Sequence, residues 1–257
     1  MIGQKKLIAK FKSYSIETLP HSMLFVGELG CGKHELVKMI SQHFNLDVID
    51  ITDKITLETI DNIYISSTTC IYVIDATKIN ERQQNVVLKF LEEPSSNAYI
   101  IMLTTSKSLL LETVLNRCVS YEFEPYNRDE LVQFLDFESG IEDLLYYCHT
   151  PGQIINTTKE TLDATISLVD NIITNIRKAR FSNTLKIPSS VSKLDAGLFF
   201  RVLLERLYLK YVDNHDIIIY NMYEYACEYY KRFNTQRFDV DSLISSLTTE
   251  LWEVCKR

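Results

Sequence analysis

Glycine, proline and basic residues are scarce in this chain of 257 residues. Glycine occurs 7 times and proline 5 times, which excludes collagen-like chains and Gly/Pro-rich low-complexity chains. Lysine and arginine number 27 against 34 aspartates and glutamates, a net charge of −7. A chain of this charge has no strongly basic surface to draw the whole molecule onto nucleic acid. Any contact with DNA is therefore expected to be local or shared with partner proteins.

Long apolar runs and paired cysteines are also missing. No apolar run reaches the roughly 18 to 20 residues that a membrane helix needs, and residues 1–12 alternate charged with apolar side chains, unlike a signal peptide. We therefore expect a soluble, cytoplasmic protein with no membrane contact. The 6 cysteines form no CxxC pair and have no histidine at ligand spacing. Neither a disulfide framework nor a zinc site is expected.

The first half of the chain does contain short apolar runs separated by helical patterns. Several of these runs are apolar almost without interruption, which is typical of strands buried on both faces of a parallel sheet. The expected strands are residues 23–26, 48–51, 71–74, 99–103 and 119–123. Helices are expected after the first strand and over residues 85–91 and 109–115. This alternation predicts a doubly wound α/β domain with a five-stranded parallel sheet.

Beyond Pro125 the strand signals stop and every segment has the helical period. The expected helices are residues 129–137, 141–149, 153–159, 162–180, 195–213, 217–233 and 240–256. A break is expected at residues 187–190, where the sequence reads IPSS. The second half of the chain is therefore predicted to be all helical.

Residues 27–33 read GELGCGK and lie between an expected strand and an expected helix. In that context the GxxxxGK pattern predicts a phosphate-binding loop. The glycines let backbone N–H groups turn inward, the helix N-terminus adds partial positive charge, and Lys33 reaches the outer phosphates. The residues expected to hold the nucleotide are Gly27, Gly30, Cys31, Gly32, Lys33 and His34. A serine or threonine after the lysine normally holds Mg²⁺, and with His34 in that place nucleotide binding survives more easily than metal-dependent hydrolysis.

Asp75 ends the third expected strand, where a parallel sheet places residues that face a ligand. A carboxylate at this point is expected to coordinate Mg²⁺, although a simple cap of the strand end is the alternative. The next residue is Ala76, where a hydrolytic site needs a carboxylate to polarise water. Glu92 and Glu93 resemble a catalytic pair, but they close a helix before Pro94 and are more simply read as capping, exposed residues.

Further segments carry a family resemblance. IGQ at residues 2–4 and LPHSMLF at 19–25 resemble the opening of bacterial clamp-loader AAA+ subunits. NVVLKFLEEP at 85–94 resembles their NALLKxLEEP segment. LTT at 103–105 and TVLNRC at 113–118 are similar to their sensor-one strand and SRC motif. Sequence motifs support the resemblance up to about residue 160. Beyond that residue, only the helical architecture supports it.

Within that family the chain resembles the delta-prime type of DNA polymerase III, which also has alanine after the strand-end aspartate. Motor subunits of the family carry Ser or Thr, a DE pair and a lid arginine where this chain has His34, Ala76 and Gln153. The resemblance therefore implies binding of ATP or ADP, with Thr104 at the site, weak or absent Mg²⁺ and no hydrolysis. It also implies that Arg117 is an arginine finger acting in trans on a neighbouring subunit's ATP. A surface ion pair is the alternative for Arg117.

The resemblance implies three domains and a set of partners. The expected domains are an AAA+ nucleotide-binding domain (1–125), a helical lid (126–160) and a helical collar for oligomerisation (161–257). The implied partners are other clamp-loader subunits in a hetero-pentameric ring, the sliding clamp, and primed DNA through the assembled complex. The four-cysteine zinc module of bacterial relatives is absent between Lys33 and Asp75, which suggests a compact version and leaves bacterial or phage origin open. A hydrolysing motor subunit and a stand-alone AAA+ DNA remodelling ATPase are the alternative functions.

Overall fold

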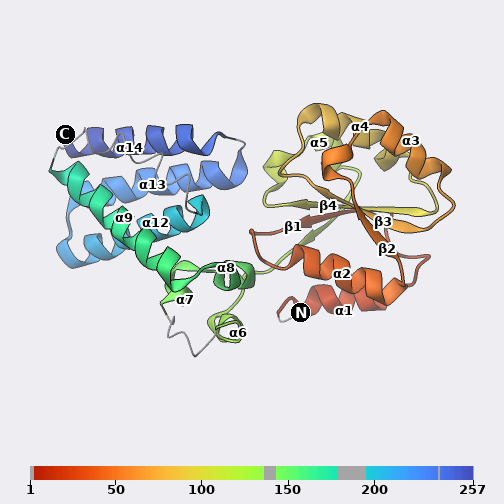
Figure 1. Cartoon of the computed structure of the whole chain (residues 1–257), viewed down its shortest axis with the longest axis horizontal. Helices are drawn as coiled ribbons and strands as arrows, with labels where there is room; N and C mark the ends of the chain where they lie inside the picture. Colours follow the sequence, from red (N-terminus) through yellow and green to blue (C-terminus); the bar gives the residue numbers. More distant parts are fainter. Residues whose placement is uncertain (1–2, 136–142, 179–194, 237, 257) are drawn as a thin grey trace. The chain divides into compact units, whose positions relative to one another are not determined.

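The computed structural model describes residues 3–135, 143–178, 195–236 and 238–256. These residues divide into two compact units, Met1–Glu130 and Leu131–Arg257 (Figure 1). The first unit is α/β and the second is all helical. The fold class predicted from the sequence is confirmed. The further division of the second unit into lid and collar stays a prediction.

The first unit is built on a five-stranded parallel sheet. Its strands are β1 (Ser22–Val26), β2 (Asp47–Asp50), β3 (Cys70–Asp75), β4 (Ala98–Thr104) and β5 (Val119–Glu122). They lie in the order β2-β3-β4-β1-β5, so β1 is flanked by two strands that come much later in the sequence. Every pairing is parallel. All carboxyl ends of the strands therefore meet at one edge of the sheet, where such folds bind ligands.

Helices cover both faces of this sheet (Figure 1). On one face lie α1 (Lys5–Ser13) and α2 (Lys33–Phe44). On the other face lie α3 (Leu57–Ile65), α4 (Glu81–Glu92) and the short α5 (Glu112–Leu115). Single 3₁₀ turns occur at Thr52–Lys54 and Lys107–Leu109. Because helices cover both faces, the central strands are buried on both sides, as their uninterrupted apolar runs predict.

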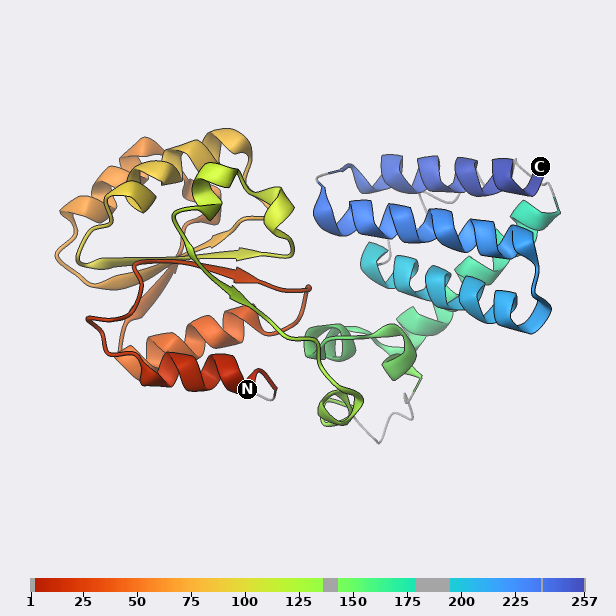
Figure 2. The ribbon, with the colours of Figure 1, turned by 180° about the vertical axis from the view of Figure 1, so that it is seen from behind.

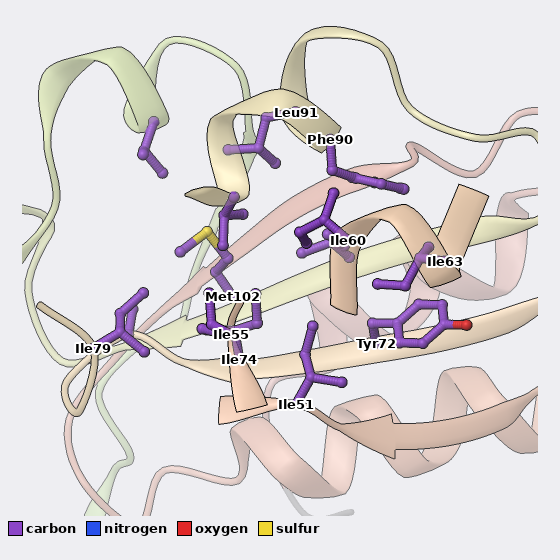
Figure 3. Packing of buried hydrophobic residues seen from close by; sticks show 14 of the residues in the cluster. Ile51, Ile55, Ile60, Ile63, Tyr72, Ile74, Ile79, Phe90, Leu91 and Met102 are labelled. Carbon is purple, nitrogen blue, oxygen red and sulfur yellow. The ribbon is translucent and has the colours of Figure 1, made fainter. Parts of the chain in front are cut away.

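Two layers of buried apolar side chains, one on each face of the sheet, pack between the sheet and the helices. The layer toward α3 and α4 is rich in isoleucine, and its members interlock above β3 and β4 (Figure 3). It includes Ile60, Ile74 and Phe90, all with no exposed side-chain surface. The opposite layer, toward α1 and α2, contains Phe11 and Phe25 with their rings 5.6 Å apart in an edge-on arrangement. Burying side chains of this size contributes about 1.5 to 3 kcal/mol each.

Three details of the first unit differ from the sequence pattern. β2 is an edge strand with all four residues exposed, whereas the apolar residue at its end, Ile51, is buried outside the strand. Helices α1 and α3 are not predicted by the pattern. The helix expected over residues 109–115 is instead a 3₁₀ turn followed by the single turn of α5. These local segments owe their structure to packing on the sheet rather than to a strong pattern of their own.

The second unit contains only helices among its described residues. They are α6 (Arg128–Val132), which crosses the unit boundary, α7 (Leu144–Tyr147), α8 (Pro151–Asn156), α9 (Lys159–Arg177), α12 (Ala196–Asn214), α13 (Ile217–Thr235) and α14 (Val240–Lys256). α12, α13 and α14 lie side by side with α9 packed obliquely across them (Figure 2). The helix expected over 153–159 ends earlier, at Asn156, because Thr158 caps a new helix by accepting a hydrogen bond from the Thr161 amide. The expected break at residues 187–190 lies outside the described residues.

No helix in the described ranges is both long and apolar enough to cross a membrane.

Candidate functional site

The register of the sheet brings Gly27, Asp75 and Thr104 to the same edge. Val26 is paired with Thr104 on β4, and Asp75 with Leu103. The Gly27 amide donates to the Thr104 carbonyl at 3.1 Å, and the Ala76 amide donates to the Leu103 carbonyl at 2.8 Å. Three segments that are far apart in the sequence therefore leave the sheet side by side. The sequence-predicted loop, strand-end carboxylate and threonine therefore lie close together at one edge of the sheet, and their common role in nucleotide binding stays a prediction.

The glycine-rich loop, residues 27–33, connects β1 to α2. Gly30 and Gly32 have φ angles of 82° and 95°, a left-handed conformation that side chains with a Cβ rarely adopt. Gly32 is also the N-cap of α2 and offers no side chain to the first helical amides. Those amides and the partial positive charge of the helix end are what an anion needs. The loop thus has the backbone geometry of a phosphate site.

Lys33 is folded back onto this loop. Its Nζ donates to the carbonyl oxygens of Gly27, at 2.6 Å, and Glu28, at 3.0 Å, and lies 3.8 Å from the Cys31 sulfur. The side chain is only 9% exposed. Burial lowers the pKa of the Lys33 ammonium, although Cys31 and Asp75 act to raise it. Burial also raises the pKa of the Cys31 thiol. Lys33 is thus a buried ammonium whose nearest partners are backbone carbonyls.

The Asp75 carboxylate interacts with the residues that directly follow it. Its Oδ1 accepts hydrogen bonds from the Thr77 hydroxyl, at 2.6 Å, and the Thr77 amide, at 3.1 Å. Its Oδ2 lies 3.6 Å from the Lys78 ammonium. Both the cap interpretation and a ligand-facing position are compatible with this arrangement. The following Ala76 has no exposed surface and packs in the isoleucine-rich layer.

Thr104 and His34 occupy different environments at this edge. Thr104 is fully buried and its hydroxyl donates to the Ser106 carbonyl at 2.8 Å. His34 is exposed at the start of α2, and its charge acts on Asp50 at the end of β2. Burial raises the pKa of the Asp50 carboxyl, but hydrogen bonds from Thr52 and the charges of His34 and Lys78 leave it below its ordinary value. His34 therefore belongs to the rim of the site.

Tyr126 is a residue of the site that the sequence pattern does not single out. Its hydroxyl donates to the Cys31 carbonyl at 2.9 Å, which fastens the glycine-rich loop to the segment after β5. Burial raises the pKa of Tyr126 to about 12, so this hydroxyl stays a donor at neutral pH. No local sequence pattern predicts this hydrogen bond, because 95 residues separate Tyr126 from Cys31.

Gly3 and Gln4 contact the segment that carries this tyrosine. The Gln4 amide group donates to the Glu124 carbonyl at 2.6 Å and accepts from the Glu124 amide at 2.9 Å. Gly3 has a φ of 75°, and a Cβ added there would lie 2.5 Å from the Tyr126 ring. Glycine is required at this position because the ring packs where a side chain would begin. The IGQ segment at residues 2–4 is the only signal of this contact in the sequence.

Arg117 lies at the opposite edge of the sheet. It precedes β5, whose first residue, Val119, is paired with Met23 near the start of β1. Gly27 follows the other end of β1, so Arg117 and Gly27 lie at opposite ends of these strands. The Arg117 guanidinium is ion-paired with Glu92 at 3.0 Å. The structure therefore does not bring Arg117 to the glycine-rich loop of the same chain.

The residues of the carboxyl edge fit a phosphate better than a metal ion. The uncapped start of α2, the left-handed glycines and the Lys33 ammonium form a donor set for anionic oxygens. Magnesium prefers oxygen ligands in an octahedral arrangement, and His34 offers only ring nitrogens after the lysine. Among the residues that the structure describes, no group of three or more His, Cys, Asp or Glu side chains could hold a metal.

Comparison with known proteins gives the family resemblance of this chain. The family model described as "DNA polymerase III, delta subunit" matches residues 47–127. The DNA polymerase III subunit gamma of Buchnera aphidicola is 23% identical over 194 residues, 58% of this chain and 54% of that protein. The delta′ subunit of Haemophilus influenzae is 27% identical over 111 residues, 43% of this chain and 33% of that protein. This chain spans about half, or less, of the length of these relatives.

The solved structure of a gamma-subunit-related protein of DNA polymerase III from Thermotoga maritima aligns over 98% of this chain and 99% of that one. The two chains are 12% identical, with a TM-score of 0.48. The family model and the sequence relatives agree with the motifs at residues 85–94 and 113–118, and they confirm the resemblance predicted from those motifs. The chain therefore resembles the gamma and delta-prime subunits of DNA polymerase III, which are clamp-loader proteins.

Proposed function

We propose that this chain is a delta-prime-like clamp-loader subunit of a replicative DNA polymerase. In this proposal it binds ATP or ADP without hydrolysing it. It supplies Arg117 to the ATP site of a neighbouring subunit during loading of the sliding clamp onto primed DNA. The names of its relatives support a role in the DNA polymerase III assembly, and the activity and partners are carried over from proteins it only partly spans.

The position of Arg117 is the observation that carries this proposal. The residue stands at the amino edge of the sheet, whereas the glycine-rich loop stands at the carboxyl edge. An arginine on that edge cannot reach a phosphate held by Lys33 of the same chain. It is about one third exposed, so a neighbouring subunit could present a phosphate to it. A guanidinium then offers paired hydrogen bonds to the transferring phosphoryl group.

The lack of hydrolysis follows from two positions beside the loop. His34 replaces the hydroxyl that would help to hold Mg²⁺, which leaves magnesium binding weak or absent. Ala76 replaces the carboxylate that would polarise water, and it has no exposed surface. Gly30, Gly32 and Lys33 would still hold the phosphates of a nucleotide, with Asp75 and Thr104 at the rear of the site. A bound nucleotide would displace the Lys33 ammonium from the loop carbonyls.

In this proposal the chain has three functional parts. Residues 1–125 form the AAA+ nucleotide-binding domain, 126–160 the helical lid and 161–257 the collar. The collar would join the other subunits of a hetero-pentameric ring. Helices α12 and α13 support this assignment because they leave large apolar side chains exposed, such as Tyr208, Val212 and Ile217.

Measurement of nucleotide binding and turnover by the isolated chain tests the proposal. We expect a fluorescent ADP or ATP analogue to bind, Lys33→Ala to abolish the binding, and ATP turnover to be absent. Lys38→Ala, an exposed lysine on the same helix, is the matched control and should leave binding unchanged. Turnover that depends on Lys33 would contradict the proposal.

A hydrolysing motor subunit is the second candidate. The gamma relatives match up to 67% of this chain, against 43% for the delta′ relative, and Lys33 and Asp75 are both present. Under this alternative the isolated chain hydrolyses ATP, and Asp75→Asn abolishes turnover while binding remains.

A further inference from the structure

The second unit contains a cavity that shares no residue with the glycine-rich loop. It lies between α7, α12 and α13 and has a volume of about 320 Å³, within the range of small-molecule sites. α12 contributes Arg201 and Glu205, one helical turn apart and therefore on one face. Tyrosines from all three helices form most of the remaining wall: Tyr146, Tyr208, Tyr223 and Tyr230.

Arg201 is a buried charge with an unused hydrogen-bond donor. The residue is 7% exposed, and its Nε donates to the Tyr147 carbonyl at 2.6 Å. Its Nη2 is buried and has no hydrogen-bond partner. A guanidinium cannot lose its proton in a protein, so burial does not neutralise it. An unsatisfied buried donor on a charged group is costly, which indicates that a partner belongs beside it.

Asp195 and Glu205 lie near Arg201, but neither forms an ion pair with it. Arg201 makes no ion pair with any residue that the structure describes. Asp195 instead caps α12, since its Oδ1 accepts hydrogen bonds from the amides of Gly197 and Leu198. Burial raises the pKa of the Cys148 thiol beside Arg201, although Arg201 itself acts to lower it. Cys148 is thus a neutral thiol at neutral pH. The charge of Arg201 is left for a ligand.

The tyrosines give the cavity flat aromatic walls and an open mouth. Tyr208 and Tyr223 lie with their ring centroids 6.1 Å apart. Tyr146 is 55% exposed and Tyr208 49% exposed, so both stand at the entrance. Aromatic faces bind planar rings by stacking, with little dependence on the identity of the ring. Glu205 on the same wall is an acceptor that an N–H group of such a ring or its substituent can use.

We propose that this cavity binds a small organic anion in which a carboxylate or phosphate stands next to a planar ring. The oxyanion pairs with the Arg201 guanidinium, the ring lies among the tyrosines, and an N–H group of the ligand faces Glu205. A nucleoside monophosphate and an N-acylated aromatic amino acid both carry this chemistry. The proposal is independent of the function proposed for the glycine-rich loop.

Calorimetric titration of the full chain tests this site. Lys33→Ala serves as the background throughout, so that the glycine-rich loop does not contribute binding. The probes are adenosine monophosphate, N-acetylphenylalanine and inorganic phosphate. Arg201→Gln removes the buried charge, and Arg206→Gln is the matched control because that arginine lies on the same helix, pairs with Asp170 and does not line the cavity.

We expect saturable binding of at least one of the two ring-bearing probes, weakened about 10- to 100-fold by Arg201→Gln and less than about 3-fold by Arg206→Gln. Binding of adenosine monophosphate alone assigns a phosphate ligand, and binding of N-acetylphenylalanine alone assigns a carboxylate ligand. Inorganic phosphate should bind at least about 10-fold more weakly. The proposal is overturned if neither ring-bearing probe binds saturably up to about 10 mM, if Arg201→Gln leaves their binding unchanged, or if inorganic phosphate binds equally well.

A second variant tests the site independently in case Arg201→Gln fails to fold. Tyr208→Ala changes a half-exposed wall residue and should preserve the helical circular dichroism spectrum. It should weaken the ring-bearing probes about 5-fold or more through lost stacking, which is worth about 1 to 3 kcal/mol per ring. Unchanged affinity of both probes in Tyr208→Ala would overturn the assignment of the ring to this wall.

Discussion

The Arg117 guanidinium is held by the carboxylate of Glu92 at the end of α4. The Nη2 to Oε1 distance is 3.0 Å, and Nη1 donates to the Thr113 carbonyl at 2.9 Å. Both side chains are partly exposed, 36% for Arg117 and 52% for Glu92, and ion pairs of this kind contribute only about 0 to 1 kcal/mol. The guanidinium can therefore leave Glu92 at small cost when a phosphate of a neighbouring subunit comes within reach.

Arg117→Ala should lower the ATP turnover of the assembled clamp loader while leaving the isolated chain intact. An arginine finger contributes on the order of a thousand-fold or more in turnover at the site it serves. Arg117→Lys should rescue poorly because an ammonium cannot make the paired contacts. The measurement is the steady-state ATPase rate of the complex reconstituted with the partner subunits of the same organism.

Two further variants control this experiment. Arg82→Ala removes an exposed arginine from α4 and should leave turnover unchanged. Glu92→Gln releases Arg117 from its ion pair and should not reduce turnover. A complex with full ATPase activity despite Arg117→Ala would rule out the finger.

The free energy of unfolding of the first unit should rise with pH on the alkaline side because of Lys33. In the unfolded chain its pKa is near 10.5, and burial lowers it in the fold. Between those two values the unfolded chain binds more protons, so stability increases as pH rises through this window. Below the lowered pKa, both states are charged and the fold carries the full cost of a buried ammonium.

Lys33→Met should remove this pH dependence, so the stability of the wild type relative to the variant increases as pH rises from the lowered pKa of Lys33 toward 10.5. The single tryptophan, Trp252, lies in the second unit. Amide hydrogen exchange of β1 and β4 is therefore the appropriate measurement. A wild type and a variant with parallel pH profiles would show that Lys33 does not titrate abnormally.

Gly3→Ala should destabilise the first unit by about 1 to 3 kcal/mol. The new Cβ meets the Tyr126 ring at 2.5 Å, and the φ of 75° is unfavourable for alanine. Tyr126→Phe should cost about 1 kcal/mol through the lost hydrogen bond to Cys31 and should increase hydrogen exchange at the start of α2. Gly152→Ala, within α8, is the control and should be neutral or stabilising. Equal effects of Gly3→Ala and Gly152→Ala would contradict this account.

Ala76→Glu should unfold the first unit in part rather than create an ATPase. Ala76 has no exposed surface, and a carboxylate forced into that layer costs several kcal/mol, about 2 to 5. Ser67→Glu adds the same charge at an exposed position before β3 and should leave stability unchanged. Thermal unfolding followed by far-ultraviolet circular dichroism compares the two. A stable Ala76→Glu protein that hydrolyses ATP would mean that the site tolerates a catalytic carboxylate.

The sequence predicts the sheet of this fold well and its smaller helices poorly. The strands at Met23, Ile71 and Tyr99 are apolar throughout because both of their faces are covered, and that signal depends on no distant contact. α1 and α3 have weaker signals: α1 is rich in lysine and buries only Phe11 fully. Their helical structure depends on packing against a sheet that local spacing does not reveal.

The sequence predicts the glycine-rich loop of the candidate site, but it does not predict the side-chain contacts around that loop. GxxxxGK between strand and helix specifies the backbone of residues 27–33, because glycine geometry and helix ends are local properties. The contact of Tyr126 with Cys31 and that of Arg117 with Glu92 join segments with no shared pattern. The sequence likewise does not predict that Lys33 is buried against its own loop, because a flexible side chain can reach several different hydrogen-bond acceptors.

The exposed edge strand β2 has a consequence for how copies of this protein meet. Its four residues carry Asp47 and Asp50 at the two ends, with the half-exposed apolar pair Val48 and Ile49 between them. A second copy aligned antiparallel along this open edge would set Asp47 of each copy opposite Asp50 of the other. Like charges placed directly opposite each other on paired strands are destabilising. The two aspartates at the ends of β2 therefore disfavour edge-to-edge pairing of β2 between two molecules, which would otherwise extend the sheet from one copy to the next.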